Sequence, residues 1–112
     1  MERLITGDIV VLPFPSFDLK SSKKRPALVL GVHPKGAVVC PITTKVFANS
    51  LQLSLKSTDF ESGSLKTDSL ILPLWFSTFQ FSSFLYKAGH LKQEKIREVL
   101  SKILDFFKTN QA

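Results

Sequence analysis

The fold is decided by residues 24–44, which read KRPALVLGVHPKGAVVCPITT. Residues 26–31 and 37–42 are apolar runs, and each has the length of one short strand. The Pro-Lys-Gly at residues 34–36 is typical of a tight turn, because proline fixes φ and glycine tolerates positive φ. The stretch therefore predicts a β-hairpin.

The open end of this predicted hairpin brings a guanidinium next to a hydroxyl. Because the two strands run antiparallel, the start of the first lies beside the end of the second, which places Arg25 near Thr43. A guanidinium beside a hydroxyl can bind a phosphate group. The segment before Arg25 adds three cations, Lys20, Lys23 and Lys24. The same residues also allow a purely structural interpretation, in which Arg25 pairs with Asp8 or Asp18 and Thr43 only ends a strand.

The charge of the chain is positive and unevenly distributed. Fifteen Lys and Arg residues against nine Asp and Glu residues give a formal net charge of +6. Residues 20–57 contain no acid, and their seven cations are Lys20, Lys23, Lys24, Arg25, Lys35, Lys45 and Lys56. Such a one-sided segment favours a polyanionic partner, although solubility alone would also explain it.

Further apolar runs predict three more strands, separated by loops. Residues 15–24 have the polar, cationic and Ser-containing composition of a loop, and residues 59–66, which include Gly63, also indicate a loop. We expect Pro13 and Pro15 to end the first strand of the chain, because proline cannot donate a ladder hydrogen bond. The three further strands are expected at residues 9–12, 51–56 and 69–72.

Near Gln93 the hydrophobic period changes from that of a strand to that of a helix. The apolar residues at helical spacing are Ile96, Val99, Leu100, Ile103 and Phe107. Five short strands close best into a small barrel, on which the helix would pack its apolar stripe. We therefore expect a single domain over residues 1–112, mainly β with one C-terminal α-helix, built as a small barrel.

The sequence lacks the common signatures of metal and cofactor sites. One cysteine and two histidines cannot supply a zinc-ligand spacing, and neither a phosphate loop nor a nucleophile elbow occurs. Cys40 lies in an apolar run, where we expect a buried thiol. The apolar segments make poor membrane spans and no signal peptide is evident, so we expect a cytoplasmic protein without cofactor, metal or membrane contact.

An ordered series of motifs resembles the MazF/PemK family of toxins from type II toxin–antitoxin systems. The series is Gly7-Asp8-Ile9-Val10, Pro13-Phe14-Pro15, residues 24–30, Cys40-Pro41-Ile42-Thr43-Thr44 and Asp68-Ser69. It follows the family's order over nearly the whole chain. The resemblance implies an SH3-like barrel of the CcdB/MazF/PemK type with a C-terminal helix, usually as a homodimer.

The resemblance also implies an activity and its residues. Members of the family are mostly metal-independent endoribonucleases that cleave single-stranded RNA and are held inactive by a small acidic antitoxin. By position, Arg25 and Thr43 match the catalytic arginine and threonine of the family. We expect attack by the RNA 2′-OH, giving a 2′,3′-cyclic phosphate and a 5′-OH. The residues expected to bind the RNA are Lys20, Lys23, Lys24, Thr44 and Lys45.

One segment departs from the family pattern. Ser77 stands where relatives often carry an arginine, within an aromatic run over residues 74–86. This run could form core, cover a dimer or antitoxin surface, or stack on unpaired bases. The missing cation also keeps open an alternative function, a catalytically weak member that binds nucleic acid or protein, as a gyrase-poisoning toxin does. Asp18 and His33 are only weak candidates for a general base, and we expect a structural role for His90.

Overall fold

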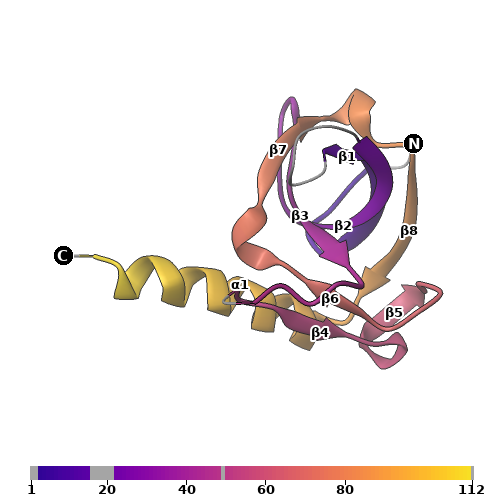
Figure 1. The fold of residues 1–112 in the computed structure, drawn as a ribbon. Helices are drawn as coiled ribbons and strands as arrows, with labels where there is room; N and C mark the ends of the chain where they lie inside the picture. The colour runs from indigo at the N-terminus through magenta and orange to yellow at the C-terminus, as the bar shows by residue number, and fades with distance from the viewer. Residues whose placement is uncertain (1–2, 16–21, 49, 112) are drawn as a thin grey trace.

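The computed structural model describes residues 3–15, 22–48 and 50–111, which form a mainly β structure with one C-terminal helix (Figure 1). The strands are β1 (Asp8–Pro15), β2 (Ser22–His33), β3 (Gly36–Thr43), β4 (Leu53–Leu55), β5 (Phe60–Gly63), β6 (Ser69–Ile71), β7 (Ser77–Gln80) and β8 (Tyr86–Leu91). Three short 3₁₀ turns are η1 (Ser57–Asp59), η2 (Pro73–Trp75) and η3 (Phe81–Ser83). The helix is α1 (Gln93–Thr109). The expected fold class is confirmed.

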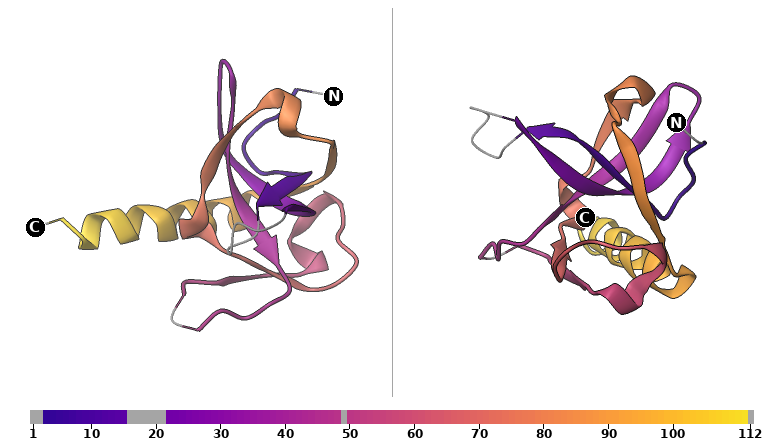
Figure 2. Two further views of the ribbon diagram at one scale, coloured as in Figure 1. Left: turned by 45° about the horizontal axis from the view of Figure 1, so that its top comes forward. Right: turned by 90° about the vertical axis from the view of Figure 1, so that its right-hand side faces the viewer.

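The described strands form one antiparallel sheet that curves into a half-barrel. Their order is β4-β6-β3-β2-β1-β8-β5, and β7 additionally pairs with β3. Helix α1 lies across one side of this sheet, and its C-terminal half extends beyond the barrel (Figures 1 and 2). The curved sheet and the helix together create two separate apolar interiors.

The predicted hairpin is confirmed as β2 and β3. Its register runs from Ala27 opposite Pro41 to His33 opposite Gly36, with an irregularity between Val29 and Gly31. The turn lies at residues 34 and 35, as the sequence predicts. The ends of the two strands away from this turn therefore meet at the same edge of the structure.

Strands β2 and β3 contribute to both apolar interiors because their side chains alternate between the two faces of the sheet. Ala27 and Val29 belong to the cluster inside the half-barrel, together with Val39. Leu28 and Cys40 point the other way, into the cluster beneath α1 and β4–β6. Burial on both faces explains why these strands are continuously apolar rather than alternating.

The prediction of five strands was wrong, because eight are present among the described residues. β5 occupies part of the segment expected to be a loop, and β7 and β8 lie in and after the aromatic run. Three of the four residues of β5, and likewise of β7, are exposed, so neither strand shows an alternating apolar pattern. Their pairing with β8 and β3, rather than local pattern, accounts for these strands.

The expected loop over residues 15–24 is also corrected at both ends. β1 continues to Pro15 and β2 begins at Ser22, so Pro13 lies within a strand. The pairing of β1 with β8 runs only from Asp8 to Val11. Beyond Val11, no described residue of β8 pairs with β1. Pro13 has no N–H, but on this side of β1 it therefore breaks no described ladder bond, which is why a proline is tolerated there.

A buried carboxylate joins the start of β1 to β8. Asp8 is fully buried and accepts hydrogen bonds from the Ile5 N–H and from His90 Nδ1, both at 2.8 Å. Lys87 Nζ lies 3.2 Å from the same carboxylate. His90 therefore has a structural role, as expected. The partners of Asp8 are His90 and Lys87, and not Arg25 as the structural interpretation of the sequence proposed.

Only the first half of α1 packs as expected. Ile96 and Val99 are buried, and Leu100 and Ile103 pack partly against the same cluster. Phe107, predicted to belong to the packed stripe, is instead 49% exposed, because the helix has passed the edge of the barrel by then (Figure 1). Within the described residues, no helix has the length and apolar character needed to cross a membrane.

Candidate functional site

A cleft of about 380 Å³ lies at the open end of the β2–β3 hairpin. One wall comes from the start of β2 and another from the end of β3 with the two residues that follow. A third wall comes from Leu65, Lys66 and Thr67, which precede β6, and from Ser69 at its start. The cleft brings Arg25 and Thr43 together, as the hairpin topology predicts.

Arg25, which lines this cleft, has an unsatisfied donor. Its Nε atom is buried and finds no hydrogen-bond acceptor among the described residues. A buried donor without a partner costs about 1–3 kcal/mol, so the position gains stability when a ligand oxygen arrives. Arginine also keeps its charge under all ordinary conditions, and its planar fork suits phosphate oxygens.

The hydroxyl of Thr43 is held in place by the chain that follows it. Thr43 is only 7% exposed, and its Oγ1 accepts a hydrogen bond from the Lys45 N–H at 3.1 Å. Its backbone lies opposite Leu70 of β6. Because Oγ1 already acts as an acceptor, its own hydrogen remains suited to donate to a ligand.

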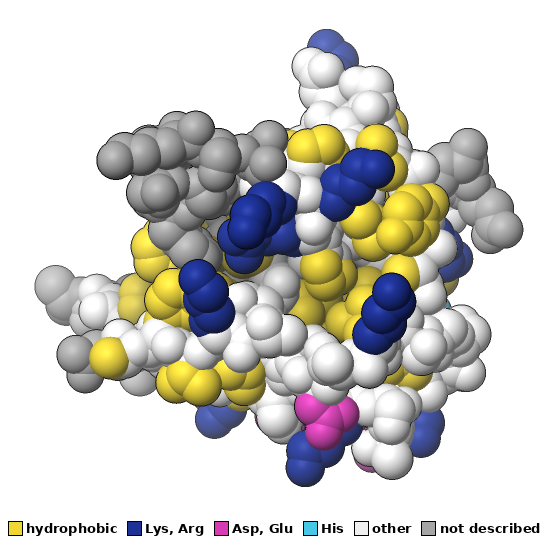
Figure 3. All heavy atoms as spheres, turned by 45° about the vertical axis from the view of Figure 1, so that its right-hand side comes forward, with side chains coloured by type: hydrophobic (Ala, Val, Ile, Leu, Met, Phe, Trp, Pro, Cys, Tyr) yellow, Lys and Arg dark blue, Asp and Glu magenta, His cyan; other side chains and the backbone are white. Residues whose placement is uncertain are grey.

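The cleft is strongly cationic. Its lining includes the five cations Lys23, Lys24, Arg25, Lys45 and Lys66, and no acid among the residues that the structure describes. Figure 3 shows dark-blue side chains on several sides of a hollow whose floor carries apolar side chains. A depression of this kind concentrates positive potential and favours an anionic, extended ligand.

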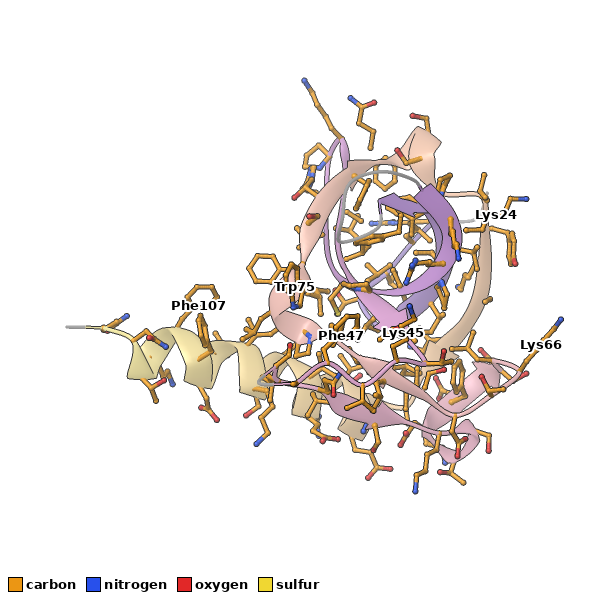
Figure 4. All side chains as sticks on the ribbon, viewed as in Figure 1. Lys24, Lys45, Phe47, Lys66, Trp75 and Phe107 are labelled. Atoms are coloured by element: carbon orange, nitrogen blue, oxygen red, sulfur yellow. The ribbon has the colours of Figure 1, made fainter. Side chains whose placement is uncertain are left out.

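Part of the cleft was not anticipated from the sequence. Lys66, Thr67 and Ser69 line it, and none was among the predicted binding residues. Figure 4 shows that the labelled lysines 24, 45 and 66 come from three segments far apart in sequence. The signal that could have found this wall is the polar run directly before β6, but its position depends on the pairing of β6 with β3.

The remaining predicted residues fall into three groups. Thr44 lines the cleft with the predicted lysines of β2 and with Lys45. Lys20 and Asp18 lie outside the described residues. His33 lies at the opposite end of β2, roughly 26 Å from Arg25 along the strand, and accepts a hydrogen bond from the Lys35 N–H. That distance removes His33 from any proton transfer in the cleft.

Ser77, the position at which relatives often carry an arginine, pairs with Val39 in the β3–β7 ladder and is exposed. It does not contribute to the cleft described above. The cations that are present come instead from β2 and from the segments that follow β3 and precede β6. The cleft is therefore cationic without a basic residue at position 77.

The aromatic run over residues 74–86 divides between interior and surface. Phe84 is buried in the half-barrel, and Phe79 packs partly against it. Trp75 and Phe81 are 52% and 40% exposed, and Tyr86 is 55% exposed. The run is thus neither wholly core nor wholly an interaction surface.

Cys40 is buried as expected, and burial raises the pKa of its thiol to about 12. Such a thiol stays protonated and unreactive at neutral pH. Within residues 3–15, 22–48 and 50–111, no three His, Cys, Asp or Glu side chains gather closely enough to hold a metal ion. What the cleft offers is a guanidinium, a positioned hydroxyl and surrounding lysines, a set that can bind and polarise a phosphodiester.

Comparisons with known proteins agree with this architecture. The family model described as PemK-like, MazF-like toxin of type II toxin–antitoxin system matches residues 5–107. An endoribonuclease in complex with its cognate antitoxin from a Mycobacterial species is 13% identical, with a TM-score of 0.67, covering 92% of this chain and 96% of that one. The Mycobacterium tuberculosis toxin MazF-mt6 is 21% identical, with a TM-score of 0.63, covering 85% and 89%. No curated protein sequence matches the chain.

Proposed function

Because the chain belongs to the PemK-like, MazF-like toxins of type II toxin–antitoxin systems, we propose that it is an endoribonuclease that cleaves single-stranded RNA without a metal ion. The observation that carries the proposal is the buried, unsatisfied Nε of Arg25 in the same cationic cleft as the Thr43 hydroxyl. An orphaned donor at this place fits a phosphate oxygen that completes its hydrogen bonding.

The chemistry needs few protein groups because RNA carries its own nucleophile. The 2′ oxygen loses its proton and forms a bond to phosphorus, while the bond from phosphorus to the 5′ oxygen breaks and that oxygen gains a proton. The products are a 2′,3′-cyclic phosphate and a 5′-OH. Arg25 would stabilise the extra negative charge on the pentacoordinate phosphorus, and Thr43 would donate to a phosphate oxygen. The lysines would hold the flanking phosphates.

The test is cleavage of end-labelled RNA in excess EDTA, with the product ends mapped. Arg25→Lys keeps the charge but loses the planar fork, so we expect RNA binding to persist while the cleavage rate falls by about 10²–10³. Thr43→Val keeps the shape without the hydroxyl, and we expect a loss of similar size. If the wild-type protein binds RNA and forms no product, the chain is instead a non-catalytic binding member of the family.

We further propose a small acidic antitoxin as the natural inhibitor. The net charge of +6 and the acid-free lining of the described cleft provide a complementary surface. One similar structure contains an endoribonuclease with its cognate antitoxin. We expect the product of a small acidic reading frame adjacent to the toxin gene to bind stoichiometrically and to compete with RNA. Noncompetitive inhibition would place it elsewhere on the molecule.

A second copy of the chain is the proposed occupant of the apolar face formed by α1 and the barrel. A groove of about 270 Å³ is lined by Leu30, Gly31, Val38, Phe76, Leu100 and Ile103. Beyond it, Leu104 and Phe107 are 58% and 49% exposed, and the Phe107 ring lies 6.3 Å from that of Phe76. Isolated soluble proteins rarely expose so continuous an apolar surface.

Sedimentation equilibrium tests this dimer. Leu104→Glu introduces a charge into the apolar face and is expected to shift the protein toward monomers. Ser101→Glu places the same charge at another exposed position of α1 and should leave the association unchanged. A wild-type protein that remains monomeric at high concentration would refute this part of the proposal.

A further inference from the structure

Tyr86 is an exposed aromatic side chain on the same face of the sheet as one wall of the cleft. Val11 of β1 lies opposite Pro26 of β2 on one side and opposite Tyr86 of β8 on the other. Directly opposed residues of antiparallel strands point to the same face of a sheet. Pro26 and Lys24 line the cleft and point to this face, so Tyr86 shares the face of that wall of the cleft, about 10 Å from Pro26 across two strand spacings.

The surface between Tyr86 and the cleft is apolar and bordered by charge. Val11 is only 7% exposed, whereas Tyr86, the single tyrosine of the chain, is 55% exposed. Pro13 lies on the same face, two residues from Val11, and pairs with Lys24 of the cleft. An aromatic ring beside an apolar floor and next to phosphate-binding cations is the arrangement by which proteins hold single-stranded nucleic acids.

We propose that Tyr86 stacks on an unpaired base of the RNA strand, at a nucleotide next to a phosphate that Lys24 holds at the edge of the cleft. The inference rests on the proposed function, since it takes RNA as the ligand of the cleft. A nucleic acid fits better than a protein segment because Lys24, one of the five cations of the cleft, pairs with Pro13 beside the apolar floor. Stacking accepts the flat face of every base, so Tyr86 contributes affinity and position rather than a fixed sequence.

The test measures binding without cleavage, using fluorescein-labelled 2′-O-methyl RNA strands, which lack the nucleophilic hydroxyl. Tyr86→Ala is expected to weaken binding of base-bearing strands roughly 5- to 150-fold, the range for loss of one stacked base. Tyr86→Phe and Tyr86→Trp keep a flat ring and should bind as the wild type does. Tyr86→Leu keeps an apolar side chain without a ring and should resemble Tyr86→Ala.

Two controls separate stacking from general surface effects. Phe81→Ala removes another exposed aromatic side chain of the same run and should leave binding unchanged. A strand with abasic sites at its centre should bind the wild-type and Tyr86→Ala proteins equally, because it has no base to stack there. Since tyrosine is uncharged, Tyr86→Ala should also leave the salt dependence of binding unaltered.

The outcomes distinguish this inference from the proposed function. Normal binding by Tyr86→Ala, or equal losses on base-bearing and abasic strands, would overturn the stacking role even if the protein cleaves RNA. The expected losses in a protein that never cleaves RNA would support stacking and refute the nuclease. Failure of the wild-type protein to bind any strand would overturn both. A change in oligomeric state with unchanged strand binding would assign Tyr86 to a protein contact instead.

Discussion

The salt dependence of RNA binding provides a quantitative test of the cleft. Each phosphate neutralised in a single strand contributes a slope of about −0.7 to the logarithm of the binding constant against the logarithm of salt concentration. If all five cations of the cleft contact phosphates, the slope is about −3.5. A fourfold increase in salt, from about 50 to about 200 mM, should then weaken binding roughly 130-fold.

The informative perturbation is Lys66→Ala, because Lys66 belongs to the wall that only the structure reveals. Removing one phosphate contact should reduce the slope to about −2.8, so the same salt increase should weaken binding only roughly 50-fold. Lys102→Ala is the matched control, since Lys102 is exposed on α1 and does not line the cleft. Fluorescence anisotropy with a 2′-O-methyl RNA strand measures both slopes without interference from cleavage.

Two results would refute this reasoning. A wild-type slope of about −0.7 would mean that a single cation contacts the strand, so the cleft would not follow the RNA backbone. Equal reductions in slope for Lys66→Ala and Lys102→Ala would mean that binding senses only the net charge of the protein. In either case the cleft would lose its assignment as the path of the strand.

Three further predictions concern the fold. Gly7→Ala should lower the free energy of unfolding in urea by about 1–3 kcal/mol, because Gly7 has φ of +101° and a Cβ would meet the Ile96 and His90 side chains. Ile96→Ala should lower the free energy of unfolding by about 2–5 kcal/mol, measured in the same way. Val46→Ala, at a 79% exposed position, should change the free energy of unfolding by no more than about 0.5 kcal/mol. Burial raises the pKa of the Cys40 thiol from 9.0 to about 12, so the unfolded chain loses this proton at a lower pH than the native protein does. The thiol's contribution to the free energy of unfolding should therefore fall as the pH rises from 9.0 to about 12. At about pH 8, Cys40 should accordingly react with a thiol reagent only after unfolding, and rapid reaction of the native protein would contradict its burial.

The hairpin and the meeting of Arg25 with Thr43 could be predicted because they depend on local information. The turn composition at residues 34–36 and two apolar runs are enough to pair β2 with β3. Antiparallel pairing then brings the far ends of the two strands together whatever the rest of the chain does. This part of the site follows from a short stretch of sequence and elementary strand geometry.

The other wall of the cleft could not be predicted, because it depends on contacts between distant segments. Lys66 reaches the cleft only since β6 pairs with the end of β3, where Leu70 lies opposite Thr43. β7 was missed for a related reason, as its mostly exposed residues carry no period of their own. The prediction that Pro13 ends the first strand was wrong, because β1 pairs with β8 only as far as Val11. Beyond Val11, a residue without an N–H is tolerated on that side of β1.

The double-sided burial of β2 and β3 has a consequence for how this protein can evolve. Residues 27–29 and 39–42 are all buried, so nearly every substitution along the middle of these strands disturbs one interior or the other. Variation is tolerated chiefly at the two extremities of the hairpin, one of which carries the cleft. The ligand preference of the cleft can therefore change during evolution while the buried strands β2 and β3 stay the same.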